Sequence, residues 1–139
     1  MLELATALRA LQFYAHHAHH ICARAVFNQD HETLGEIYSK ADSDYDNVIE
    51  RFIGTKGDSA LDEQAVLVAA VQKCGQTPVK GVVENKVLLS NCLTALKEIN
   101  AKIEVLCKTP GISQGTIQMI GDQANSNEVL IYKLQQRCR

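Results

Sequence analysis

Four of the five histidines of this chain lie in one short segment, at His16, His17, His19 and His20. If this segment is helical, imidazoles three or four residues apart share a face and can bind one transition-metal ion together. His19 lies one turn after Ala15 and borders the apolar stripe, whereas the other three histidines are expected to project outward. His19 is therefore the best placed of the four for a buried metal site.

A row of carboxylates provides the second group of side chains with metal chemistry. Asp42, Asp46 and Glu50 are each about one helical turn apart, so their side chains stack along one face. Such a row is either a solvated acidic ridge or an anionic wall for hard cations such as Fe²⁺ and Mg²⁺. The sequence leaves both interpretations open.

The fifth histidine, His31, is expected on the same helix as the carboxylates but far from them. It precedes Asp46 by fifteen residues on the same expected helix, which is about 22 Å at a rise of ~1.5 Å per residue. One copy of the helix cannot place both residues on one ion. If His31 shares a metal with Asp46 and Glu50, a second copy must run antiparallel, as a two-fold dimer provides.

Apolar residues three and four apart predict the elements that position these groups. The expected helices are Leu4–Ala25, Leu34–Phe52, a shorter one at Leu61–Val71, Leu89–Leu106 and Ile117–Leu134. Asn28 or Asp30 is expected to cap the second helix, and Ser59 the short one. The pattern predicts one all-α domain over residues 1–139, a four-helix bundle. Its long connection, from Gly54 to Val79, contains the short helix and favours a crossover.

Composition excludes several classes of protein. A hydrophobic fraction of 46% and a charged fraction of 22% are typical of a globular domain. Sixteen acidic and fourteen basic residues give a net charge of −2, which does not favour nucleic acid as the partner. No apolar run approaches the ~20 residues of a membrane span, so we expect a cytoplasmic protein. The five cysteines are widely separated, and we expect free thiols.

The spacing of the histidines and carboxylates resembles the ferroxidase signature of the Dps-type miniferritins. His31 follows His19 by twelve residues, Asp46 follows after fifteen more, and Glu50 after another four. Phe27, the His31-Glu32 pair and Glu50-Arg51 also match. Further along the chain, Gly115-Thr116 begins a last helix that contains Ile131-Tyr132-Lys133-Leu134, as in that family.

The resemblance implies a ferritin-like bundle and an iron site at a two-fold interface. His19 and His31 would come from one subunit, and Asp46 and Glu50 from its mate. The resemblance further implies a hollow homo-oligomer, a dodecamer, in which Fe²⁺ is oxidised by peroxide or oxygen and ferric mineral is stored. Iron is the expected metal, with zinc as another divalent ion that such ligands accept.

Two departures from the family pattern concern a ligand and the DNA-binding tail. The family usually has an aspartate four residues after the second histidine, where this chain has Gly35. Additional ligands are therefore sought at Glu32, Glu36, His20 and Asp42. The chain begins almost directly in its first helix, without the lysine-rich tail that the family often uses on DNA. Tail-mediated DNA binding is therefore not expected.

Two other functions remain open at this point. One is a ferritin-like structural or binding oligomer that has lost efficient oxidation because of Gly35. The other is a zinc- or copper-binding module centred on the histidine segment. Iron oxidation requires Asp46 and Glu50, whereas a module of histidines alone tolerates the loss of Asp46.

Overall fold

The computed structural model describes residues 1–81 and 83–139, and all regular secondary structure in these two ranges is helical. The elements are α1 (Leu2–Ile21), α2 (Phe27–Lys56), the short 3₁₀ turn η1 (Asp58–Ala60), α3 (Glu63–Gly75), α4 (Asn85–Cys107) and α5 (Gln114–Cys138). The all-α class is confirmed. Within the described ranges, no helix combines the length and the apolar content needed to cross a membrane.

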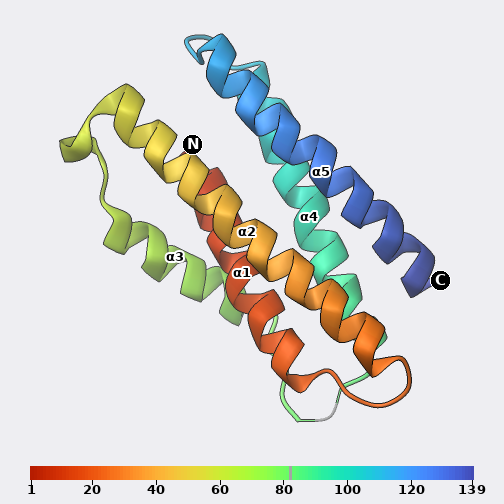
Figure 1. The fold of residues 1–139 in the computed structure, drawn as a ribbon. Helices are drawn as coiled ribbons and strands as arrows, with labels where there is room; N and C mark the ends of the chain where they lie inside the picture. The colour runs from red at the N-terminus through yellow and green to blue at the C-terminus, as the bar shows by residue number, and fades with distance from the viewer. Residues whose placement is uncertain (82) are drawn as a thin grey trace.

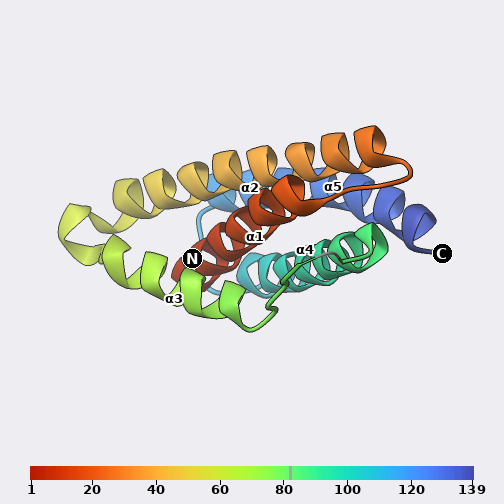
Figure 2. The same ribbon diagram turned by 90° about the horizontal axis from the view of Figure 1, so that it is seen from below.

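The four long helices form two antiparallel pairs, α1 with α2 and α4 with α5 (Figure 1). Because α2 and α4 run in the same direction (Figure 1), the connection between them must return along the length of the molecule. This connection contains α3, the short helix that the sequence predicts. Figure 2 shows α3 beside α1, outside the four long helices, and α3 packs against α1.

Small side chains on α1 allow its neighbours to approach closely. Ala5, Ala15 and Ala18 are fully buried, and α1 contacts α2, α3 and α4. The other long helices fill the space with larger side chains. The largest of these are Leu34, Ile37, Tyr45, Leu88, Leu89, Leu96, Ile99, Ile103, Ile120 and Leu130. Burying each such side chain contributes on the order of 2 kcal/mol before entropy is subtracted, so this core holds the bundle together.

The first helix ends at Ile21, earlier than the spacing to Ala25 predicts. Cys22 has extended backbone, and the Ala23 N–H leaves the helical pattern to donate to Asn85 Oδ1 at 3.1 Å. The turn into α2 then uses two non-glycine residues in the left-handed region, Arg24 (φ 73°) and Val26 (φ 59°). This region is unfavourable for a β-branched residue, so Val26 stores strain in the turn.

The predicted helix caps are wrong at two places. α2 begins after Val26 without a side-chain cap, and Asp30 lies inside the helix. Asp30 is 1% exposed because its carboxylate accepts bonds from Arg137 at the end of α5. At α3 the cap is Asp62, whose carboxylate accepts from Ala65 N at 3.0 Å.

Asp30 joins the beginnings of α2 and α4 to the end of α5. Arg137 Nε and Nη2 each donate to one carboxylate oxygen at 2.9 Å, and Asn85 Nδ2 donates at 2.9 Å. Replacing Asp30 with Asn keeps the shape but removes the charge that these donors share. We expect the free energy of unfolding to fall by about 2 kcal/mol, as measured by urea denaturation.

The matched control for this substitution is Glu84→Gln. Glu84 pairs with Arg24 at 3.6 Å, and both side chains are mostly exposed. Exposed ion pairs contribute little, so the control should lose less than about 0.5 kcal/mol. Equal losses in the two variants would contradict a stabilising role for the buried Asp30 carboxylate.

Candidate metal centre

His19 and His31 lie face to face where α1 and α2 meet. Their ring centroids are 3.5 Å apart and the ring planes differ by 27°. His19 is in the last turn of α1 and His31 in the second turn of α2, so the short turn between the helices brings them together. Phe27 packs against His31 with centroids 4.9 Å apart. Both imidazoles are half-buried.

Reciprocal hydrogen bonds set the protonation of both rings. His19 Nδ1 lies 2.9 Å from the His31 carbonyl oxygen, and His31 Nδ1 lies 3.1 Å from the His19 carbonyl oxygen. Since a carbonyl oxygen only accepts, each Nδ1 carries the proton and donates it. In the neutral imidazole this leaves the lone pair on Nε2. Metal-binding histidines are commonly oriented by such a bond from the other ring nitrogen.

Cys22 completes the packing around His31. Its sulfur lies 3.6 Å from His31 Nδ1, and its thiol donates to the His19 carbonyl oxygen at 3.3 Å. Burial raises the pKa of the Cys22 thiol, and nearby Asp30 adds to the rise. Both effects favour the protonated thiol, which donates its hydrogen bond to the His19 carbonyl oxygen.

The other histidines of α1 are arranged differently. His17 is exposed, and its Nε2 lies 3.3 Å from the Val79 carbonyl oxygen. His20 is exposed as predicted, but His16 is half-buried, with its ring 4.4 Å from that of Tyr38. His16 and His20 have ring centroids 4.5 Å apart. The prediction that His16 projects outward is therefore wrong, because Tyr38 of α2 covers it.

The predicted acidic row lies on α2, and a cation from α1 occupies part of it. Arg9 Nη1 lies 2.5 Å from Asp42 Oδ1, and Arg9 Nη2 lies 3.8 Å from Asp46 Oδ1. The guanidinium also lies over the Tyr45 ring, 3.7 Å from its centroid. The Asp46 and Glu50 side chains are exposed. A metal ion at Asp46 would have to compete with Arg9 for the carboxylate.

One chain does not bring the histidine pair and the acidic row together. Among residues 1–81 and 83–139, no three His, Cys, Asp or Glu side chains form a group that would hold a metal ion. This agrees with the distance along α2 from His31 to Asp46. A shared site therefore needs ligands from a second copy, as the sequence predicts.

Gly35 lies directly beside the histidine pair. A Cβ built at this position would be 3.6 Å from His19 Cε1 and Nδ1, which is ordinary van der Waals contact. A side chain fits there, so no clash explains the glycine. Glu32 is exposed, and Glu36 forms an ion pair with Lys133 at 3.3 Å. Neither carboxylate occupies the position beside His19 that Gly35 leaves open.

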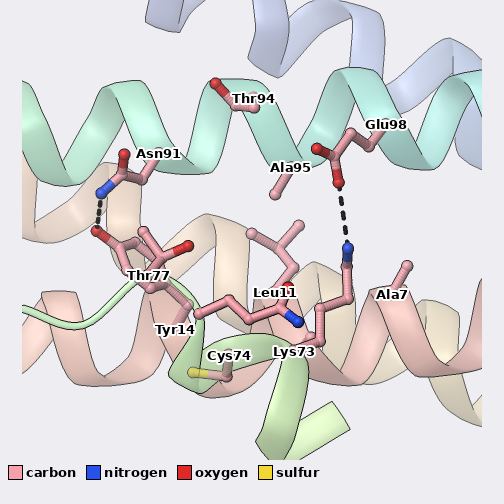
Figure 3. Close-up of a pocket in the computed structure, with 12 residues that line it drawn as sticks. Ala7, Leu11, Tyr14, Lys73, Cys74, Thr77, Asn91, Thr94, Ala95 and Glu98 are labelled. Carbon is pink, nitrogen blue, oxygen red and sulfur yellow. Dashed lines mark hydrogen bonds and ion pairs between the residues drawn. The ribbon is translucent and has the colours of Figure 1, made fainter. Parts of the chain in front are cut away.

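A separate pocket of about 180 Å³ lies between α1, α3 and α4 (Figure 3). Asn91 Nδ2 donates to the Tyr14 hydroxyl at 2.8 Å, and Lys73 bonds to Glu98 at 3.3 Å. Burial raises the pKa of Tyr14 to about 12, so its hydroxyl stays neutral. The polar groups labelled in this pocket are largely paired with one another, and we assign no chemistry to it.

Both C-terminal arginines make contacts within the chain. Arg137 is bound to the buried Asp30 carboxylate, and this bond raises the pKa of Arg137. The Arg139 carbonyl oxygen accepts a bond from Lys86. A phosphate would have to displace Asp30 from Arg137.

The structure adds two residues that sequence reasoning missed. Cys22 follows His19 by three residues, and this spacing places both on one side of a helix end. The spacing could have identified Cys22 as a neighbour of His19. Arg9 and the acidic row lie on different helices, and no local spacing indicates that contact. All five cysteines are free thiols, as predicted.

Comparisons of this chain with protein-family models, with curated proteins and with solved structures give no match.

Proposed function

We propose that this chain is a ferritin-like subunit that oxidises Fe²⁺ at two-fold dimer interfaces and stores Fe³⁺ inside a homo-oligomeric cage, a dodecamer. Each site would take His19 and His31 from one subunit and Asp46 and Glu50 from its mate. Asp42, Glu32, Glu36 and His20 are the residues near enough in sequence to assist.

The observation that carries the proposal is the prepared histidine pair. Both Nδ1 atoms donate to backbone carbonyls at 2.9 and 3.1 Å, which directs the lone pairs to Nε2. Histidines that ligate a metal are typically oriented in this way, by a bond from the other ring N–H to a carbonyl or carboxylate. The carboxylates on the same helix supply the oxygen ligands that iron accepts beside imidazole.

An apolar face on α3 supports a dimer. Leu67, Val68 and Val71 are 36%, 58% and 58% exposed, although the helix buries Val66 and Ala70 against the rest of the chain. A short helix that is apolar on both faces usually has a second partner. Because α3 lies along α1, a second copy covering this face would be close to the α1–α2 layer that carries the proposed ligands.

The proposed chemistry needs only electron transfer from bound iron to an oxidant. Each Fe²⁺ gives up one electron. One hydrogen peroxide accepts two electrons and two protons, its O–O bond breaks, and two waters form. The protein supplies ligands with open positions for the oxidant, and it confines the Fe³⁺ product.

The test is peroxide-driven and aerobic Fe²⁺ oxidation by the purified protein, with its size followed by gel filtration. We expect rates well above those in buffer, in a large assembly. His31→Ala and Asp46→Asn should each lower the rate by roughly ten- to hundredfold. His17→Ala serves as the control and should keep the rate. No acceleration over buffer by the unmodified protein would overturn the proposed oxidation.

Two observations favour a second candidate, an oligomer with weakened oxidation. Gly35 leaves open the position beside His19 where the resembled family has a carboxylate. In addition, Arg9 neutralises Asp42 and lies near Asp46. A large assembly that binds Fe²⁺ without accelerating its oxidation would identify this second function.

A further inference from the structure

Among residues 1–81 and 83–139, two of the five histidines make no hydrogen bond through either ring nitrogen. His17, His19 and His31 each place a ring nitrogen within hydrogen-bond distance of a backbone carbonyl oxygen. In the part of the chain that the structure describes, no such contact is made by His16 or His20. These two are also the histidines that face each other, with ring centroids 4.5 Å apart.

Their helix and the neighbouring Tyr38 ring position the two imidazoles. They are four residues apart in the last turns of α1, so they lie on one side of the helix. His16 packs against the Tyr38 ring of α2, with centroids 4.4 Å apart and planes at 31°. This contact limits the rotation of His16. His20 is exposed, so an ion between the two rings remains open to water.

We propose that His16 and His20 form a two-histidine chelate for a borderline divalent transition-metal ion, with Cu²⁺ as the ion that binds most tightly. Imidazole nitrogen suits copper, nickel and zinc, and affinities for a given nitrogen site rise to a maximum at Cu²⁺. No third protein ligand belongs to this pair among the described residues. Water therefore completes the coordination. Of the residues proposed for the histidine–carboxylate centre, the pair shares only His20, an assisting residue there, and copper binding does not depend on iron oxidation.

The test is titration of the full-length protein with Cu²⁺, followed by calorimetry and by electron paramagnetic resonance. We expect one copper per chain with two equatorial imidazole nitrogens. His16→Ala and His20→Ala should each weaken binding by roughly tenfold or more, since even indirect partners of a metal are worth that much. Because His20 is exposed, its variant should keep the helical content measured by circular dichroism.

Two matched variants make the copper experiment decisive. His17→Ala removes an exposed neighbour on the same helix and should leave copper affinity unchanged. His31→Ala disrupts the stacked pair and should also leave the two-nitrogen signal in place. Copper binding that survives His16→Ala and His20→Ala but is lost in His31→Ala would overturn the proposal. Fe²⁺ oxidation retained in His16→Ala, which is not among the proposed iron ligands, would show that the two sites succeed or fail separately.

Discussion

Co-expression of subunits carrying His31→Ala with subunits carrying Asp46→Asn is expected to restore about a quarter of the unmodified rate of Fe²⁺ oxidation, although each variant alone is expected to be roughly ten- to hundredfold slower. In a two-fold dimer, each site takes its histidines from one subunit and its carboxylates from the other. A mixed dimer therefore has one site with both substitutions and one with neither. Random pairing makes about half of the dimers mixed, and half of their sites are intact.

The control for this experiment places both substitutions on one chain. When the double variant is co-expressed with unmodified subunits, each mixed dimer has one site lacking His31 and one lacking Asp46, so no intact site forms in it. Activity should then come only from unmodified dimers. If the two single variants do not complement each other, although both assemble and bind one another, the site does not draw its ligands from two subunits.

Helix positions were predictable because they depend on local spacing. The predicted apolar stripes fall on the long helices α1, α2, α4 and α5, except that the first stripe runs past the end of α1 to Ala25. The predicted end of the second helix at Gly54 is too early, because α2 continues to Lys56. Helix ends were less predictable, because they depend on tertiary contacts. Asp30 is a good N-cap by type, but Arg137, more than a hundred residues away, draws its carboxylate into the core.

The same contrast between local spacing and tertiary contacts applies to the candidate site. Spacing alone placed His31 near one end of α2 and the carboxylates further along it, and it predicts that a site shared by both groups would need a second copy. The stacking of His19 on His31 and the exchange of their Nδ1 bonds depend on a strained turn at Val26, which no periodicity indicates. The contact of Arg9 with the acidic row depends on the register of α1 against α2, a property of the packed pair.

The position of Gly35 leads to a second large expected effect. Gly35 follows His31 by one turn and faces His19, so a carboxylate there would lie beside both imidazoles. We expect Gly35→Asp to raise Fe²⁺ affinity by roughly ten- to hundredfold, the range over which groups around a metal tune its binding. The oxidation rate at low Fe²⁺ should rise with it. Anaerobic Fe²⁺ titration and stopped-flow oxidation measure the two effects.

Two further substitutions separate the effect of the added carboxylate from the effect of removing glycine. Gly35→Ala should raise the free energy of unfolding by about 0.5–1 kcal/mol, because glycine costs that much inside a helix and the Cβ has room. It should leave Fe²⁺ affinity unchanged. Gly35→Asn has nearly the shape of aspartate without its charge and should gain much less affinity.

If Asp, Asn and Ala at this position all bind Fe²⁺ equally, the metal does not lie beside His19 and His31. The stacked histidines would then be a packing contact, and the carboxylates of α2 would have to bind iron without them.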